Sequence, residues 1–252
     1  MKSHKIEFPG SQNMNLSARI DEPDDGLSKG AVLFAHCFTC SKNLKAVGRI
    51  SRVLTNHGMG VFRFDFTGLG ESEGDFADTN FSSNIDDLKA AADFMNAEWA
   101  SPRMLIGHSL GGAAVLQAAH QISSVEAVVT IGAPCNPEHV SRHLMDKMEQ
   151  IKEQGKARVK LGGRIFTIKK QFLDDLKEQK MNKVIKNLGN PLLIFHSPVD
   201  KTVGIDNAAH IYQLAKHPKS FISLDDADHL MTNEEDARYV GSVTAAWVNR
   251  YL

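Results

Sequence analysis

Hydrophobic residues along the chain fall into short continuous runs that alternate with segments of helical periodicity. Such runs are typical of strands buried on both faces of a sheet, and they read AVLFAHC, GVFRFDF, RMLIGH, VEAVVTIGA and PLLIFHS. After the first three runs, hydrophobic residues recur at helical spacing over residues 41–57, 81–99 and 109–119. This alternation predicts an α/β fold with a mostly parallel central sheet and helices on both faces.

The helix predicted over residues 41–57 has Ser41 as its expected N-cap and Gly58 as its expected end. The ends of the chain extend the pattern with strands over 4–9 and 13–22, a helix over 207–217, a strand over 220–224 and a helix that ends in AAWVNRYL. All of these elements fit one domain spanning residues 1–252, because an α/β fold of this length is commonly a single domain.

Residues 136–189 interrupt the alternation with a segment rich in Lys, Glu, Asp and Gln. Inside it, ARVKLGGRIFTI predicts a hairpin, since Gly162-Gly163 suits a two-residue turn. We interpret the segment as a small cap over the edge of the sheet where α/β folds bind ligands, with an inert surface excursion as the alternative. Its apolar positions at helical spacing are expected to dock the cap on the body, and these are Leu144, Met145, Met148, Ile151, Phe172, Leu173 and Leu176.

Composition narrows the possible partners and the cellular setting. The net charge of −1 gives no electrostatic basis for nucleic-acid binding. The mean hydropathy is −0.26, and no apolar run reaches the ~20 residues needed to span a bilayer. The N-terminus lacks the apolar core of a signal peptide, and the cysteines Cys37, Cys40 and Cys135 are too few for a disulfide framework. These features predict a soluble, cytoplasmic protein with reduced thiols and no nucleic-acid or membrane partner.

The run RMLIGH leads into SLGG and a helical segment, which places Ser109 between two glycines where a strand becomes a helix. Turn chemistry gives no reason for a serine at this point. A G-x-S-x-G motif does, because its serine sits on a sharp corner that exposes the hydroxyl, and the residues two before and two after it must be small. Gly107 and Gly111 hold those positions. Ser109 is therefore the candidate nucleophile.

A serine hydroxyl needs a base, and the base needs an orienting carboxylate. In a fold with this motif the acid and then the histidine follow the serine, each on a loop after a later strand. Asp200 comes after PLLIFHS, and His229 comes after SFISL. The other candidate histidines near the serine, His36 and His108, occur in the wrong order. Acidic residues on the histidine's own loop, Asp225, Asp226 and Asp228, are expected to cap or solvate that loop.

The oxyanion of a tetrahedral intermediate requires preorganised backbone N–H donors. One should be the amide of Leu110, directly after the nucleophile, and the other the amide of Phe38 on the loop after AVLFAHC, with Cys37 as the alternative register. A small acyl pocket is expected near Phe38, Leu110 and Leu230. No cofactor is needed for this chemistry.

Cys37 and Cys40 form a C-x-x-C pair whose context differs from that of a thioredoxin-like motif, and no further ligands at zinc-site spacing accompany them. We interpret them as reduced thiols lining a loop, with no metal site. A thiol-based, peroxide-handling function is an alternative that rests on this pair. Asp65 lies in the turn-rich sequence DFTGLGES, and we expect it to have no direct catalytic role.

These motifs together resemble the α/β-hydrolase superfamily across essentially the whole chain: H-x-F at His36, D-x-x-G-x-G-x-S at Asp65, G-H-S-L-G-G around Ser109, and the later Asp200 and His229. More narrowly, HCFTCSKNLKA and GRIFTIKKQFLDDL are similar to the hydrolase half of bacterial fusions with an OsmC-like (osmotically inducible protein C) domain, and the OsmC-like half is absent from this sequence. The resemblance implies a serine carboxylesterase with a Ser109–His229–Asp200 triad.

The expected function is hydrolysis of small-molecule, short-acyl esters through an acyl-enzyme. The cap segments contain more charged than apolar residues, which argues against the broad apolar surface of a lipase. Thioesterase and amidase or peptidase activity would use the same residues. A non-catalytic α/β-hydrolase scaffold that binds a small molecule or a partner is an alternative of another class, and it predicts at least one missing triad residue. The sequence leaves the oligomeric state open.

Overall fold

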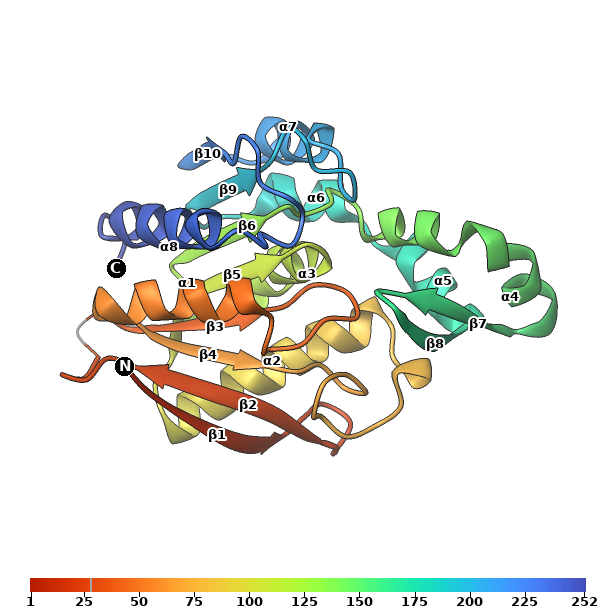
Figure 1. Cartoon of the computed structure of the whole chain (residues 1–252), viewed down its shortest axis with the longest axis horizontal. Helices are drawn as coiled ribbons and strands as arrows, with labels where there is room; N and C mark the ends of the chain where they lie inside the picture. The colour runs from red at the N-terminus through yellow and green to blue at the C-terminus, as the bar shows by residue number, and fades with distance from the viewer. Residues whose placement is uncertain (28) are drawn as a thin grey trace.

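An eight-stranded sheet forms the centre of the structure (Figure 1), a computed structural model that describes residues 1–27 and 29–252. Its strands lie in the order β1-β2-β4-β3-β5-β6-β9-β10. Neighbouring strands are parallel from β4 to β10, and β2 pairs antiparallel with both β1 and β4. The strands are β1 (Lys2–Pro9), β2 (Asn15–Glu22), β3 (Ala31–Ala35), β4 (Gly60–Phe64), β5 (Pro102–His108), β6 (Ala127–Ile131), β9 (Leu192–His196) and β10 (Lys219–Ser223). The predicted mostly parallel α/β sheet is confirmed.

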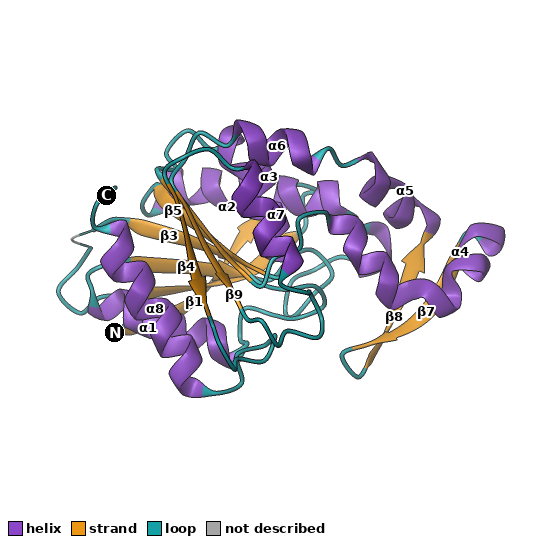
Figure 2. Cartoon of the chain, turned by 90° about the horizontal axis from the view of Figure 1, so that it is seen from above, coloured by secondary structure: helices purple, strands orange, loops and turns teal. Residues whose placement is uncertain are grey.

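Helices cover both faces of this sheet (Figure 2). One face carries α1 (Lys45–Asn56) and α8 (Glu234–Val248), and the other carries α2 (Phe81–Glu98), α3 (Leu110–Ala118), α6 (Met181–Asn187) and α7 (Asp206–Leu214). Among the described residues, no helix is both long enough and apolar enough to cross a membrane.

Alternate residues of the central strands enter two separate cores, as the two-residue period of a strand requires. Leu33 and Leu105 face the layer of α2 and α3, whereas Val32, Val61 and Ile106 face the layer of α1 and α8. All are aliphatic and fully buried, which is why these strands read as continuous hydrophobic runs in the sequence.

Helix α1 begins later than its hydrophobic pattern suggested. Its N-cap is Leu44, not Ser41, and the helix ends at Asn56, just before Gly58 with its φ of +86°. The loop before α1 is bound to Asp65, which follows β4, because the backbone N–H of Lys42 donates to Asp65 Oδ1 at 2.6 Å. A tertiary contact therefore prevents the first residues of the periodic segment from joining the helix.

Residues 136–189, which we call the cap segment, lie between β6 and β9. Their first part, up to α5 (Lys170–Glu178), projects beyond the sheet at the right of Figure 1, whereas α6 packs against α3 on the body. The predicted hairpin is present: β7 (Lys156–Leu161) pairs antiparallel with β8 (Arg164–Lys169) around Gly162 and Gly163, whose φ angles are +53° and +81°. The 3₁₀ helix η3 (Pro137–Lys147), α4 (Met148–Gln154) and α5 flank it.

Aromatic side chains dock the cap segment on the body. Phe172 of α5 stacks on Phe38, with ring centroids 5.7 Å apart, and Phe166 of β8 meets Phe76 at 5.0 Å. Leu144, Ile151, Leu173 and Leu176 are buried as expected, and Met148 is half-buried. Met145 is 69% exposed, so its predicted docking role is wrong. Residues 137–147 form a 3₁₀ helix with three residues per turn, and the α-helical spacing used for the prediction does not apply there.

Gly107 gives a direct test of the close approach between β5 and α3. A Cβ atom at Gly107 would lie 2.3 Å from the carbonyl oxygen of Gly111, a backbone atom that cannot swing aside. We expect Gly107→Ala to lower the free energy of unfolding by about 2 kcal/mol or more, because overpacking against rigid backbone is destabilising. Chemical denaturation monitored by circular dichroism measures this change.

Gly48→Ala is the matched control for that substitution. Gly48 lies in α1, and no atom is found within 4 Å of a Cβ placed there. The same change should stabilise the protein by up to about 1 kcal/mol, because alanine favours the helix over glycine. Equal effects at the two positions would contradict the packing argument.

Candidate active site

Ser109 occupies the corner between β5 and α3 in a strained conformation, with φ of +54° and ψ of −124°. A non-glycine residue holds such angles only where its surroundings enforce them. Here the enforcement is close backbone packing, since a Cβ at Gly111 would lie 2.4 Å from the carbonyl oxygen of His36. The corner turns the serine hydroxyl out of the sheet, as the G-x-S-x-G motif predicts.

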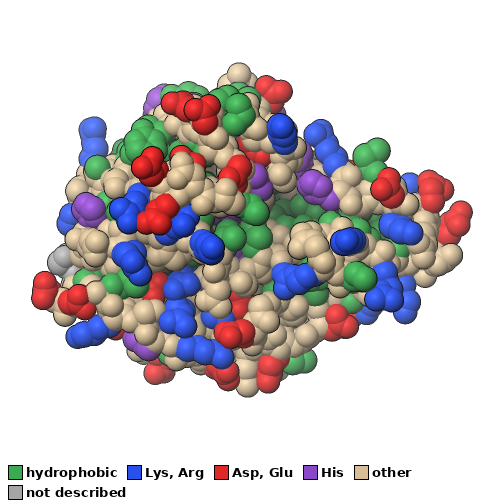
Figure 3. All heavy atoms as spheres, viewed as in Figure 1, with side chains coloured by type: hydrophobic (Ala, Val, Ile, Leu, Met, Phe, Trp, Pro, Cys, Tyr) green, Lys and Arg blue, Asp and Glu red, His purple; other side chains and the backbone are tan. Residues whose placement is uncertain are grey.

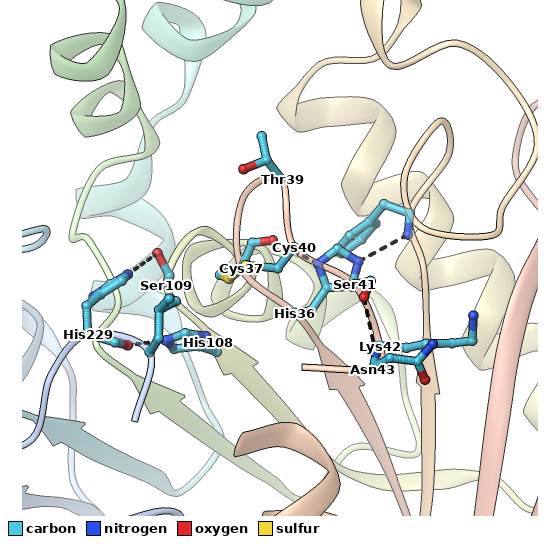
Figure 4. Close-up of a disulfide and its surroundings, with 12 residues drawn as sticks. His36, Cys37, Thr39, Cys40, Ser41, Lys42, Asn43, His108, Ser109 and His229 are labelled. Atoms are coloured by element: carbon cyan, nitrogen blue, oxygen red, sulfur yellow. Dashed lines mark hydrogen bonds between the residues drawn. A yellow bond between two sulfur atoms is a disulfide. The ribbon is translucent and has the colours of Figure 1, made fainter. Parts of the chain in front are cut away.

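The structure brings the three expected residues together in one hydrogen-bond chain. The Oγ atom of Ser109 lies 2.9 Å from Nε2 of His229, and Nδ1 of the same ring lies 2.7 Å from Oδ2 of Asp200. Figure 4 shows His229 pointing toward Ser109. Asp200 lies on the loop after β9 and His229 on the loop after β10, so loops at one edge of the sheet supply all three side chains.

Backbone amides and the histidine hold Asp200 in its charged form. Its Oδ1 accepts hydrogen bonds from the N–H groups of Thr202 at 2.8 Å and Val203 at 2.9 Å. Burial alone would raise the pKa of the Asp200 carboxyl, but the hydrogen bonds from His229 and from these amides bring the pKa below its ordinary value. The carboxylate can therefore only accept hydrogen bonds, which fixes the ring of His229 with its Nδ1 proton toward Asp200.

Asp228 has a different role, as expected for an acid on the histidine loop. Its Oδ1 accepts a hydrogen bond from the N–H of Leu230 at 2.8 Å, and its carboxylate also binds the amide and hydroxyl of Thr232. These bonds cap the loop that carries His229. The carboxylate of Asp228 is thereby committed to the backbone rather than to the imidazole.

Two buried histidines hydrogen-bond to the loops that carry His229 and Asp200. The sequence did not reveal this supporting role. Nε2 of His108 lies 2.7 Å from the carbonyl oxygen of His229, and Nε2 of His196 lies 2.7 Å from that of Val203. Burial lowers the pKa of His108 to about 3 and also lowers the pKa of His196. Both rings are neutral at neutral pH and donate from Nε2. The position of His108 beside the nucleophile was visible in the sequence, but its role as a donor to another loop was not.

A pocket of about 270 Å³ opens in front of Ser109, between the body and the cap segment. Phe38, Leu110 and Leu230, the three residues expected to bind substrate, all line it. Figure 3 shows hydrophobic and histidine side chains gathered in this hollow. From the cap segment come five lining residues that the sequence did not place in the pocket: His139, Val140, His143, Leu161 and Gly162.

Charge is nearly absent from the pocket wall. Among the described residues that line it, none is Asp, Glu, Lys or Arg. Burial lowers the pKa of His143, and the neighbouring His139 and His229 lower it further. Nε2 of His139 is 2.7 Å from the carbonyl oxygen of Thr202. The wall therefore suits an uncharged ligand.

The two amides expected to bind an oxyanion are free to do so. Leu110 is the first residue of α3, where N–H groups have no partner within the helix. Within the described part of the chain, neither the Leu110 N–H nor the Phe38 N–H donates a hydrogen bond. Both residues line the pocket beside Ser109.

Cys37 and Cys40 form a disulfide, which corrects the expectation of reduced thiols (Figure 4). The N–H of Cys40 donates to the carbonyl oxygen of Cys37 at 3.2 Å, and Thr39 between them has a φ of +61°. This tight turn brings the two Cα atoms to 5.4 Å, within the range a disulfide spans. Counting cysteines could not reveal a turn of this shape. Cys135 is free and half-buried, and burial raises the pKa of its thiol.

No group of three potential metal-ligating side chains occurs among the residues described. Asp65, expected to have no direct catalytic role, is buried and binds the Lys42 amide, the Lys42 ammonium and the Glu71 amide at 2.6, 2.6 and 2.9 Å. It therefore joins the loop after β3 to the loop after β4.

Residues 27–183 match the sequence profile of the serine aminopeptidase S33 family. The chain belongs to this family of α/β hydrolases. The esterase domain of a Rhodothermus marinus protein, known from its crystal structure, has 49% sequence identity to this chain. The superposition covers 100% of this chain and 99% of that one, with a TM-score of 0.81. The protein is thus a hydrolase related to esterases, and the predicted α/β-hydrolase superfamily and fold are confirmed.

More distant matches share part of the sequence or the fold. The uncharacterized protein YfhR of Salmonella typhimurium is 25% identical over 234 residues, which are 91% of this chain and 75% of that protein. The ferulic acid-bound Est1E of Butyrivibrio proteoclasticus superposes with a TM-score of 0.82 over 97% of this chain and 98% of that one at 17% identity, which shows the shared fold.

Substitution of Asp200 and of Asp228 tests which of these two acids orients the ring of His229. We expect Asp200→Asn to lower kcat for p-nitrophenyl acetate by up to about 10⁴-fold, because an amide at this position favours the wrong imidazole tautomer. Asp228→Asn should keep most of the activity, since Asp228 binds the backbone. The acid is misassigned if the second variant is inactive and the first retains wild-type kcat.

Proposed function

We propose that the protein is a serine carboxylesterase in which Ser109 is the nucleophile, His229 the general base and acid, and Asp200 the orienting carboxylate. The observation that carries the proposal is the continuous hydrogen-bond chain from Ser109 Oγ through His229 to Asp200, at 2.9 and 2.7 Å, on the floor of a pocket. A non-catalytic scaffold would gain nothing from a strained serine so placed, because backbone strain of this kind costs about 1–3 kcal/mol.

The reaction follows from these positions. Nε2 of His229 accepts the proton as Ser109 Oγ attacks the ester carbonyl, and the imidazolium is stabilised by Asp200. The amides of Leu110 and Phe38 donate to the developing oxyanion. His229 then protonates the leaving alcohol, and a water molecule repeats the sequence on the acyl-enzyme to release the acid. No step calls for a cofactor.

The pocket wall favours esters over peptides with a free amino terminus. The family's description names aminopeptidases, whose substrates carry a positive charge close to the scissile bond. A buried charge is costly unless it is paired, and the described lining of this pocket contains no carboxylate. His139 and His143 stand there instead. A neutral ester, or a thioester through the same residues, fits the wall better.

The acyl part of the substrate should be short. Phe38 closes one wall of the pocket and is held there by Phe172 and Phe76, with centroids 5.7 Å from each ring. A chain gains about 0.8 kcal/mol for each buried methylene only while there is room for it. Because the aromatic wall is packed from behind, a longer chain would have to leave the pocket.

Replacement of the nucleophile tests the proposal. Ser109→Ala should lower kcat for p-nitrophenyl acetate by about 10⁴-fold or more and abolish labelling by a fluorophosphonate. Ser101→Ala, the same change at an exposed serine just before β5, should leave both unaltered. Esterase activity that survives Ser109→Ala in a folded protein would refute the assignment of the nucleophile.

A substrate panel tests the pocket. Along p-nitrophenyl esters, kcat/KM should be highest between acetate and butyrate and fall steeply by octanoate, because the packed wall excludes longer chains. L-Aminoacyl p-nitroanilides should be poor substrates for want of a carboxylate to hold their ammonium group. A maximum at decanoate, or faster turnover of the anilides than of matched esters, would contradict the proposed specificity.

A further inference from the structure

The Cys37–Cys40 disulfide closes the turn that carries the Phe38 amide. Both cysteines line the same pocket as Ser109, and Figure 4 shows the turn beside the nucleophile. Nothing in the hydrolysis proposed above uses these sulfur atoms. The two cysteines lie beside the oxyanion site of the proposed function, on which this inference rests. The bond between them can therefore influence the position of the Phe38 amide.

The direction of the Phe38 N–H follows from the carbonyl group of Cys37. The two belong to one peptide unit, which is planar and trans, so they point in opposite directions. The Cys37 carbonyl oxygen is bound by His36 Nδ1 at 2.8 Å and by the Cys40 N–H at 3.2 Å. Whatever holds this carbonyl therefore also aims the Phe38 amide.

His36 is suited to act as a permanent donor to that carbonyl. It is buried, and burial lowers its pKa, so the ring is neutral. The Phe66 N–H approaches Nε2 at 3.4 Å, which makes Nε2 the acceptor and leaves the hydrogen on Nδ1. This ring fixes the first end of the turn.

The second end of the turn is held by Lys42, whose amide and ammonium groups both bind Asp65 at 2.6 Å. Between these ends, the amides of Phe38 and Thr39 donate no hydrogen bond within the described residues. The Thr39 carbonyl accepts a hydrogen bond from Arg164 of the cap segment, an exposed contact. Hydrogen bonds thus hold the two ends, and the disulfide adds a covalent constraint that keeps Cys40, and with it the Cys40 N–H, against the Cys37 carbonyl.

We propose that the Cys37–Cys40 disulfide positions the Phe38 amide in the oxyanion hole, so that the disulfide form is the fully active enzyme and the dithiol form has a lower kcat. Reduction requires an external dithiol. Its thiolate attacks one sulfur, breaks the S–S bond and forms a mixed disulfide, which its second thiol resolves. The two cysteines gain two electrons and two protons, and the reductant becomes a disulfide.

The effect should fall on catalysis rather than on stability. The disulfide joins residues only three positions apart, and the entropy that a cross-link removes from the unfolded chain is smallest for short loops. An oxyanion donor that is lost or misplaced, by contrast, acts mainly on the transition state. The proposal thus predicts a change in kcat with little change in KM or melting temperature.

The test compares the oxidised protein with the same protein reduced by dithiothreitol without air, with the thiols counted by mass spectrometry after alkylation of a sample. We expect reduction to lower kcat for p-nitrophenyl acetate by about 10- to 100-fold, with KM within about threefold. The affinity for a trifluoromethyl ketone, whose adduct with Ser109 carries an oxyanion, should fall in parallel with kcat. Reoxidation should restore both.

Two variants test whether loss of the Cys37–Cys40 bond itself causes the fall in kcat. Cys37→Ser/Cys40→Ser should have the kcat of the reduced wild type and no response to dithiothreitol, whereas Cys135→Ser should respond as the wild type does. If the double variant does not fold, as judged by circular dichroism, the reversible reduction of the wild type decides the question.

The outcomes distinguish this inference from the proposed function. An oxidised protein that neither hydrolyses esters nor reacts with a fluorophosphonate at Ser109 would overturn the proposed function and the inference with it. An oxidised protein that does both, but keeps its kcat and its affinity for the ketone when Cys37 and Cys40 are reduced, would overturn the inference alone.

Discussion

The structure of this hydrolase depends on one close approach of backbone, the packing of the first turn of α3 against the ends of β3 and β5. Glycines at 107 and 111 make it possible, since a Cβ at either would lie within 2.4 Å of a backbone oxygen. The strain at Ser109, worth about 1–3 kcal/mol, is offset by the burial of β5 in both cores and of α3 in one of them. The same approach sets the free N–H of Leu110 beside the loop of Phe38.

The parallel sheet then determines where the other groups can lie. Successive parallel strands end at one edge, so the loops after β3, β5, β9 and β10 converge there. Neutral buried histidines tie these loops together, with His108 bound to the backbone of the His229 loop and His196 to that of the Asp200 loop. Charge at the site is thus concentrated on Asp200, where backbone amides stabilise it.

The cap segment and the disulfide turn complete the pocket from the other side. Aromatic packing of Phe38 against Phe172 links the turn to the cap segment, so the wall proposed to limit the substrate also joins the cap segment to the body. The uncharged lining supports the proposed preference for neutral ligands, because charge is costly to desolvate. In the proposed mechanism, substrate binding and transition-state stabilisation therefore meet in one short loop, residues 37–42.

Local pattern in the sequence was enough to predict the sheet, the hairpin at Gly162-Gly163 and the grouping of Ser109, Asp200 and His229, because strand period, turn chemistry and chain order are properties of neighbouring residues and of topology. Contacts between distant segments decided the rest. Ser41 lost the helix N-cap because Lys42 is bound to Asp65, and Met145 turned outward where a 3₁₀ helix replaced an α-helix. His139 and His143 entered the pocket only through the fold of the cap, and Cys37 met Cys40 only through a turn that residue types alone do not specify.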